Sequence, residues 1–295
     1  MGRWTGLFDR LVRVLELAER ALQERLGASA DPALLDRVLA LRWDARGGRG
    51  RLVPIEEPQL FDLADLVGVQ RNVERLIANT EQFIAGHPSN HVLLYGERGT
   101  GKSSSVKGLL ARYADRGLRA VELHKGDLLD LPDLLEALRG RSQRFLLFCD
   151  DLSFDAGDPQ YRELKAALEG SLAGPPANVC IVATSNRRHI VQERHSDNTQ
   201  ARIDEEGDLH VGETIDEKLA LSDRFGLVLG FYPFDQETYL AAVRHYADRA
   251  AVAAPWETVR EEALRWALRR SSRSGRTAKQ FIDDLAGREA LKAQA

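Results

Sequence analysis

The stretch GERGTGKS, which begins at Gly96, has residue types and spacing that suit the binding of nucleotide phosphates. Gly96, Gly101, Lys102 and Ser103 match the pattern G-x-x-x-x-G-K-[ST], whose glycines let backbone N–H groups turn toward phosphate oxygens. In this pattern the lysine reaches the terminal phosphates, and the hydroxyl of the next residue ligates Mg²⁺. An apolar run precedes the motif and a helical pattern follows it, so a phosphate cradle is favoured over a glycine-rich surface turn. The predicted phosphate-binding residues are Gly96, Glu97, Arg98, Gly99, Thr100, Gly101, Lys102, Ser103 and Ser104.

Acidic and amide side chains end two other apolar runs. Asp150 and Asp151 follow RFLLFC, where the first carboxylate can hold the Mg²⁺ shell and the second can orient a water molecule. Two adjacent acids can also simply begin a loop. Asn186 ends IVATSN and suits a hydrogen bond to a water or to the terminal phosphate, although asparagine is also a common turn residue. Beside the cradle, these side chains favour Mg²⁺-dependent chemistry on a phosphate.

Short apolar runs alternate with longer helical patterns through the middle of the chain. The runs are HVLLYG, RAVELH, RFLLFCDD, NVCIVATSN and LVLGFY, and helices are expected from Ser103, Leu131 and Pro159. Continuous apolar strands separated by helices are typical of a parallel sheet that is covered on both faces. The predicted fold class is therefore α/β.

Both ends of the chain are predicted to be helical. Apolar residues recur every three or four positions over 4–26, and a second set with this spacing consists of Leu34, Leu35, Val38 and Leu41, so we expect a helical hairpin. The stretch DARGGRGRL after it is interpreted as a linker, although its arginines could contact phosphate. After Pro233 only helical patterns remain, with Asp235 as a predicted cap and Pro255 opening a further helix.

Composition limits the classes of function. The chain has 295 residues and a net charge of −4, so it has no overall positive field that would make non-specific nucleic-acid binding strong, while a local basic patch remains open. Charged residues such as Asp9 and Arg13 interrupt the first apolar segment, which argues against a signal peptide and a membrane span. Cys149 and Cys180 lie within apolar runs and are interpreted as buried structural thiols. We expect a cytoplasmic protein without a membrane partner.

The order of these motifs resembles the AAA+ ATPases, from about Phe61 to the C-terminus. In that family a cradle, a carboxylate pair and a polar sensor are followed by an arginine finger and a helical lid. The resemblance implies a three-layer P-loop nucleotide domain that binds ATP and Mg²⁺, with Ser103 and Asp150 at the metal. It also implies that Asp151 and Asn186 act on the attacking water and the terminal phosphate.

Three further segments carry roles through the same resemblance. DLADLVGVQRNVERL is similar to the segment that leads into the AAA+ nucleotide domain, which implies that Val67 and Gly68 lie near adenine. LALSDRFG is similar to the arginine-finger box and makes Arg224 the finger. SSRSGRTAKQF is similar to the second sensor on the lid helix and makes Arg276 its arginine.

A narrower resemblance points to one bacterial group. NTEQFIAGHPSNHVLLYGERGTGKSS, CDDLSF, LSDRFG and SGRTAKQF together resemble the domain of unknown function 815 family, a group of ATP-binding proteins. The chain departs from the usual AAA+ pattern because Asp151 stands where most members have a glutamate. An aspartate reaches about one methylene less far, and small misplacements of a catalytic group can be costly, so slow turnover is expected. Asp155 is another candidate acid.

These observations predict three regions: helical 1–57, an α/β nucleotide domain at 58–233 and a helical lid at 234–295. The expected activity is Mg²⁺-dependent hydrolysis of ATP to ADP and phosphate, coupled to the remodelling or assembly of a protein client by a homo-oligomer. An ATP-gated binding module that scarcely hydrolyses ATP is the alternative. A loader acting on nucleic acid is a third possibility that rests on family analogy and scattered arginines.

Overall fold

A single large sheet organises the chain. The computed structural model describes residues 32–45, 50–154, 158–169, 174–186, 202–203, 209–210 and 221–294. The strands of the sheet are β1 (Ala40–Asp44), β2 (Arg51–Pro54), β3 (Val92–Gly96), β4 (Leu118–Glu122), β5 (Arg144–Cys149), β6 (Val179–Ser185) and β9 (Leu227–Phe231). They lie in the order β2-β1-β4-β5-β6-β3-β9, and every pair is parallel except β1 with β2. The five predicted apolar runs are thus confirmed as strands of a largely parallel sheet.

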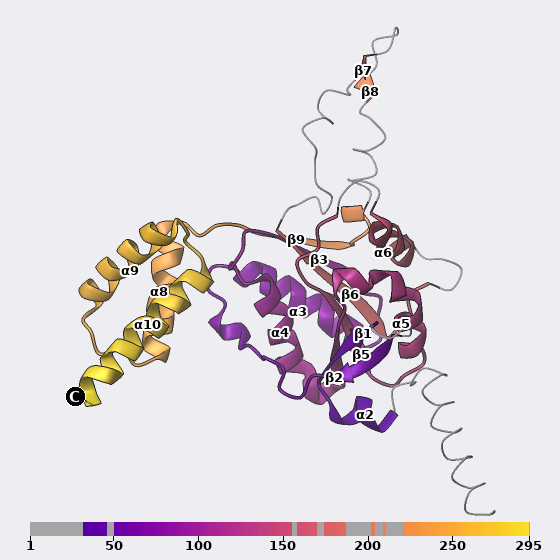
Figure 1. Ribbon diagram of the computed structural model, residues 1–295, viewed down its shortest axis with the longest axis horizontal. Helices are drawn as coiled ribbons and strands as arrows, with labels where there is room; N and C mark the ends of the chain where they lie inside the picture. The colour runs from indigo at the N-terminus through magenta and orange to yellow at the C-terminus, as the bar shows by residue number, and fades with distance from the viewer. Residues whose placement is uncertain are drawn as a thin grey trace, which may run out of the picture.

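Helices cover both faces of this sheet, as Figure 1 shows. One face carries α3 (Gln70–Ile84) and α4 (Lys102–Tyr113), and the other carries α5 (Leu131–Leu138) and α6 (Pro159–Glu169). Successive strand residues point to opposite faces, so in β3 Leu94 packs in the core beneath α3 and α4 while Leu93 packs in the core beneath α5 and α6. The predicted three-layer α/β fold is confirmed.

Three helices form a separate layer after the last strand. They are α8 (Gln236–Arg249), α9 (Trp256–Arg270) and α10 (Gly275–Gln294), and we call them the lid. The Asp235 carboxylate caps α8 by accepting a hydrogen bond from the backbone N of Thr238 at 2.7 Å, as predicted. Buried Tyr239 donates to the carbonyl of Ala263 at 3.1 Å and joins α8 to α9. The lid packs into the core on the side of α3 and α4.

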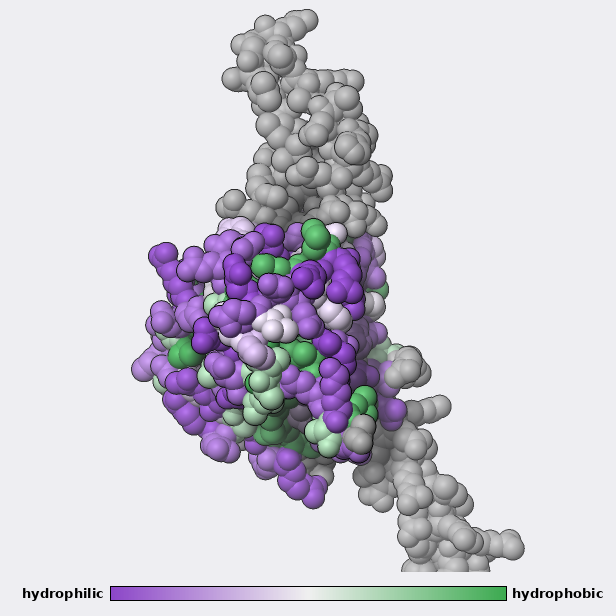
Figure 2. All heavy atoms as spheres, turned by 90° about the vertical axis from the view of Figure 1, so that its left-hand side faces the viewer, coloured by the Kyte–Doolittle hydropathy of each residue, from purple (hydrophilic) through white to green (hydrophobic). Residues whose placement is uncertain are grey.

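The outer surface of the lid is mainly polar. Figure 2 shows the side on which the lid lies, where hydrophilic residues predominate and apolar ones appear in several separate places. Leu268 and Leu291, on α9 and α10, are largely exposed. No helix in the part of the chain that the structure describes is both long and apolar enough to cross a membrane.

The structure corrects the prediction for residues 38–54. Helix α2 (Pro32–Arg37) ends before Leu41, and β1 and β2 form an antiparallel hairpin at the edge of the sheet, where a helix and a linker were expected. Leu41 and Trp43 are buried while Arg42 between them is exposed, which is the alternation of a strand. The indole of Trp43 also donates to a carboxylate oxygen of Asp130 at 3.2 Å.

The sheet therefore takes in two strands from the region predicted as helical. The three predicted regions with borders at 57 and 233 stay a prediction. The first predicted helix, over 4–26, lies outside the described residues. Cys149 and Cys180 are buried as predicted, and burial raises the pKa of each thiol to about 12. Such thiols stay protonated at neutral pH and are poor nucleophiles.

The remaining elements are short. They are the 3₁₀ turns η1 (Leu63–Asp65), η2 (Ala114–Arg116) and η3 (Lys125–Asp130), and the two-residue strands β7 (Arg202–Ile203) and β8 (Leu209–His210). Strands β7 and β8 pair with each other in a separate two-stranded sheet.

Candidate functional site

The predicted phosphate-binding motif forms a tight turn between β3 and α4. Gly96 ends β3 with φ of +127°, and a Cβ atom at this position would lie 1.8 Å from the carbonyl oxygen of Phe231. Only glycine fits there, because the neighbouring strand β9 passes too close for a side chain. Helix α4 begins at Lys102, so its unpaired N–H groups and the positive end of its dipole face the turn.

Lys102 is folded back onto the motif that precedes it. Its ammonium group donates to the carbonyl oxygens of Gly96 at 2.6 Å and Glu97 at 2.7 Å. The side chain is buried, and burial lowers the pKa of Lys102, while the carboxylates of Asp151 and Asp150 act in the opposite direction. The cation is thus already held beside the turn in which a phosphate would lie.

Two hydroxyl groups meet the carboxylate of Asp150 at the start of α4. Ser103 Oγ donates to Asp150 Oδ1 at 2.7 Å, and Thr184 Oγ1 donates to the same oxygen at 2.6 Å. Hydroxyl and carboxylate oxygens are the hard ligands that Mg²⁺ prefers. The donor set of Ser103 and Asp150 therefore fits a magnesium ion, and the role of these two residues as metal ligands stays a prediction.

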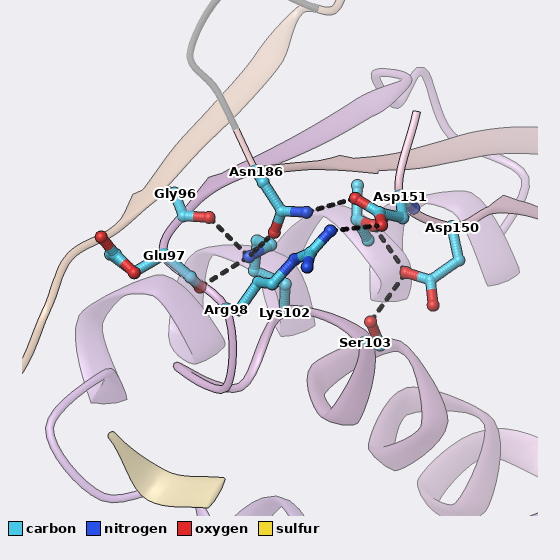
Figure 3. A network of polar contacts seen from close by, with 9 residues as sticks. Gly96, Glu97, Arg98, Lys102, Ser103, Asp150, Asp151 and Asn186 are labelled. Carbon is cyan, nitrogen blue, oxygen red and sulfur yellow. Dashed lines mark hydrogen bonds and ion pairs between the residues drawn. The ribbon is translucent and has the colours of Figure 1, made fainter. Parts of the chain in front are cut away.

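The second carboxylate, Asp151, is engaged by two neighbouring side chains (Figure 3). Asn186 donates its amide N–H to Asp151 Oδ1, and the guanidinium of Arg98 lies 3.4 Å from Asp151 Oδ2. Asn186 also accepts from Lys102 through its amide oxygen at 3.4 Å. The network therefore links the turn, β5 and β6, whose carboxyl ends lie at the same edge of the sheet.

A cavity of about 500 Å³ lies over this network and extends to the lid. This volume is in the usual range for small-molecule sites. It is lined by Phe61, Asp65, Leu66, Val67, Arg98, Gly99, Thr100, Gly101, Lys102, Ser103, Ser104, Asp150, Asp151, Thr184, Asn186, Phe234, Ala242, Tyr246, Gly275, Arg276 and Lys279. Lys102, Ser103, Asp150, Asp151 and Asn186 line the cavity at the turn and the strand ends. The segment before α3 and helix α8 contribute a mostly apolar set, which we call the apolar end: Phe61, Leu66, Val67, Ala242 and Tyr246, with the charged Asp65 beside Tyr246.

Most of the predicted site residues line this cavity, including Val67 at its apolar end. Gly68 is not among the lining residues and lies against Thr238 of α8. Gly96 and Glu97 are also outside the lining, and they contribute the carbonyl oxygens that hold Lys102. Asp155 lies outside the described residues.

Arg276 brings the lid to the phosphate-binding turn. Its backbone N–H donates to the carbonyl of Gly99 at 3.0 Å, and the residue lines the cavity. Ala242 and Tyr246 of α8 line the same cavity, and Thr238 of the same helix lies beside Gly68. The structure thus places the predicted second sensor beside the cradle.

Arg224 also lies outside the cavity lining and, unlike Gly68, Gly96 and Glu97, it is at the amino end of a strand. It lies just before β9, near the point where Leu227 N donates to His91 O at the amino end of β3. Its guanidinium forms an ion pair with Glu169 at the end of α6. Strand β9 spans five residues, or about 16 Å at roughly 3.3 Å each, which is longer than an arginine side chain.

Sequence reasoning missed several residues of the cavity. Thr184 sits two positions before Asn186 in an apolar strand, and a hydroxyl near the end of a strand that carries a candidate sensor could have drawn attention to it. Asp65, Tyr246 and Lys279 come from separate elements and share no local pattern. Asp65 is joined to the lid by His245 at 2.8 Å and Arg249 at 3.1 Å.

Solved structures of other proteins resemble this fold at low sequence identity. The Aeropyrum pernix ORC1 protein, solved in complex with DNA, gives a TM-score of 0.50 and 14% identity over 72% of this chain and 58% of that chain. The A156S mutant of Thermotoga maritima RuvB gives 0.49 and 16% over 75% of this chain and 63% of that one. The T. maritima RuvB Holliday junction branch migration motor gives 0.42 and 15% over 76% and 72%.

This chain thus spans less than two thirds of the ORC1 protein and of the RuvB mutant. No curated protein matches it. The family described as "Protein of unknown function (DUF815)" matches residues 36–289, which includes the sheet, the cradle and most of the lid. With the order of strands, the turn at Gly96 and the lid in place, the chain belongs to the DUF815 family and has the fold of the AAA+ superfamily of P-loop ATPases.

Proposed function

We propose that this chain binds ATP with Mg²⁺ in the cavity and hydrolyses it to ADP and phosphate. The observation that carries the proposal is the meeting of Lys102, Ser103, Asp150, Asp151 and Asn186 at one end of a single cavity. These residues come from the turn after β3 and from the ends of β5 and β6, so the fold gathers them from distant positions. A structural turn would not require this combination of a buried cation, two carboxylates and a polar sensor.

Each of these side chains has a role that its contacts allow. Lys102 and the N–H groups at the start of α4 would bind the terminal phosphates, while Ser103 and Asp150 would hold Mg²⁺. The ion would neutralise charge on the phosphate oxygens. Asp151 would orient and deprotonate the attacking water, and Asn186 would hydrogen-bond to that water or to the terminal phosphate.

The other end of the cavity suits a nucleoside. Phe61, Leu66, Val67 and Ala242 offer apolar surface, and Tyr246 adds an aromatic ring. An adenine ring has two apolar faces, and surfaces of this kind bind planar rings. We therefore assign the base to this end, with Arg276 near the terminal phosphate.

Arg224 has a role in this proposal only if a second copy of the chain takes part. Its position at the amino end of β9 turns it away from the cavity of its own chain. A finger that acts on the nucleotide of a neighbouring subunit would need such a position. We propose a homo-oligomer that couples ATP hydrolysis to the remodelling or assembly of a protein client.

A slow or non-hydrolysing, ATP-gated binding module is the second candidate. Two features of Asp151 favour this candidate: its side chain is shorter than that of a glutamate, and its carboxylate already contacts both Asn186 and Arg98. A water molecule would have to compete with these partners. Phosphate release under single- and multiple-turnover conditions separates the two candidates, since an ATPase cycles repeatedly and the module releases little more than one phosphate per chain.

The assignment of the cradle is tested with Lys102→Ala. Removing the ammonium group should weaken ATP binding by about ten- to a hundredfold, because charge-assisted hydrogen bonds to phosphate are among the stronger ones. Calorimetric titration of the pure protein measures this affinity. Lys107→Ala is the matched control, since Lys107 lies on the same helix and contacts Gln59 at 3.2 Å instead of the cavity. Equal affinity in Lys102→Ala and the parent would remove the basis of the phosphate assignment.

A further inference from the structure

Thr184 on β6 occupies a position between the two candidate carboxylates. It is buried, with 1% of its surface exposed. Its hydroxyl donates to Asp150 Oδ1 at 2.6 Å and accepts a hydrogen bond from the backbone N of Asp151 at 2.8 Å. One side chain on the neighbouring strand thus contacts both residues that follow β5.

The direction of each bond follows from the chemistry of the partners. An ionised carboxylate can only accept, and a backbone N–H can only donate, so the threonine proton points to Asp150 and a lone pair points to Asp151. Ser103 donates to the same oxygen of Asp150 at 2.7 Å. The orientation of the Asp150 carboxylate is therefore set from two sides, by β6 and by α4.

The contact with Asp151 also holds an unusual backbone conformation. Asp151 has φ of +53°, in the left-handed region that residues with a side chain seldom adopt. Thr184 holds the chain on both sides of this turn: its hydroxyl accepts from Asp151 N, and its carbonyl accepts from Leu152 N at 2.8 Å. Strained backbone at a site persists where the surroundings over-determine it.

We propose that Thr184 is a positioning residue that sets the directions of the Asp150 and Asp151 carboxylates for ATP hydrolysis, an inference that rests on the proposed function. Through Asp150 it fixes the orientation of the carboxylate that would hold the metal. Through Asp151 it holds the left-handed turn that directs this carboxylate toward the cavity and toward Asn186.

A purely structural hydroxyl would satisfy the N–H of Asp151 without affecting the reaction. Thr184→Val keeps the size and branching of the side chain and removes both hydrogen bonds, whereas Thr184→Ser keeps the hydroxyl. Thr80→Val is the matched control, because Thr80 is also buried and its hydroxyl donates to Leu76 O at 2.7 Å within α3, away from the cavity.

The first readout is structural and needs no hydrolysis. Crystal structures of the parent, Thr184→Val and Thr184→Ser report the backbone of Asp151 directly. We expect φ at Asp151 to leave the left-handed region, or its carboxylate to turn away from Asn186, in Thr184→Val alone. An unchanged Asp151 and Asp150 in Thr184→Val would overturn the positioning role.

The second readout is kinetic. Thr184→Val should lower kcat by about ten- to a hundredfold, because displacing a catalytic group by about 1 Å can cost that much, and should leave the ATP affinity measured without Mg²⁺ within about twofold. Thr184→Ser should recover most of kcat, and Thr80→Val should retain it. Added to Asp151→Asn, Thr184→Val should cause little further loss, since the two act as one unit. Full additivity of the two losses would contradict the proposal.

Failure of the proposed function looks different from failure of this inference. If the parent binds ATP and releases no phosphate at any protein concentration, the ATPase assignment fails. The crystal structures then still decide whether Thr184 positions the two carboxylates.

Discussion

The carboxyl ends and the amino ends of the parallel strands form two edges of the sheet, and these differ in how many candidate functional groups they bring together. At the carboxyl edge, Asn186 is hydrogen-bonded to Lys102 and to Asp151, and Asp150 accepts from Ser103. All of these residues line one cavity. At the amino edge, Arg224 is paired with Glu169, and the partly buried His91 accepts a hydrogen bond from Ile181 N of β6. The carboxyl edge has a constellation that can act on a phosphate within one chain. The amino edge has a single candidate group, which needs a phosphate from elsewhere.

The largest effect expected at the amino edge comes from Arg224→Ala. If this arginine serves a neighbouring subunit, its loss should spare ATP binding and lower hydrolysis by roughly a thousandfold or more, as for other arginine fingers. Phosphate release measures this loss, and Arg162→Ala on α6 is the control that changes an exposed arginine.

Mixing decides whether the arginine acts between chains. A mixture of the two variant proteins should recover activity, because the Arg224→Ala chain binds ATP and the Lys102→Ala chain supplies the arginine. The activity per chain of the parent should also rise with protein concentration. No rescue on mixing, together with activity that stays flat on dilution of a monomer, would place all the chemistry at the carboxyl edge.

At the carboxyl edge, Asp151→Asn should keep Mg-ATP binding and lower kcat by about a hundred- to ten-thousandfold, the usual contribution of a general base. The amide keeps the shape of the side chain and loses its basicity. Asp115→Asn, at an exposed position in η2, should behave as the parent. Turnover at the parent rate in Asp151→Asn would show that another group orients the water, with Asp155 the next candidate.

The smallest effect concerns stability at the amino edge. Burial lowers the pKa of His91 from 6.5 to about 4, and its Nδ1 accepts from Ile181 N at 3.0 Å. The unfolded chain therefore binds a proton more readily than the folded one between these values, so stability falls as the pH drops from 6.5 toward 4. The full loss is about 3 kcal/mol at 1.36 kcal/mol for each pKa unit.

Urea unfolding at several pH values measures this dependence. His91→Gln should remove it, since the amide oxygen can still accept from Ile181 and does not titrate in this range. His124→Gln, at a half-exposed position, should leave it in place. The same loss of stability in the parent and in His91→Gln would assign the pH dependence to other groups.

The contiguous parts of the site could be predicted from the sequence. The cradle is one stretch of eight residues, and Asp150 and Asn186 directly follow apolar runs, so local pattern was enough to find them. Strand β1 could not be predicted because Leu34, Leu35, Val38 and Leu41 imitate helical spacing, and β2 because DARGGRGRL has the composition of a linker. The pairing of Leu41 with Pro54 in β2 and with Val121 in β4 shows that the chain is extended.

The contacts between η1 and the lid could not be predicted for a different reason. Asp65 and His245 are 180 positions apart in the chain and meet only when the lid packs beside η1. No periodicity or motif records such a contact. Thr184 is an intermediate case. The sequence places it near the end of a predicted strand but does not indicate that its hydroxyl contacts Asp150 and the backbone N of Asp151.

The hydrogen bond from Arg276 N to Gly99 O uses main-chain atoms alone, so it does not depend on which side chain stands at 276. Relatives could exchange the arginine during evolution and keep the lid seated on the turn. The glycine has no such freedom, because it has φ of +79° and a Cβ there would lie 2.8 Å from Ser274 Oγ and 2.9 Å from Arg276 Cβ. A substitution at 276 should therefore leave this contact between lid and turn in place, whereas a side chain at 99 should disturb it.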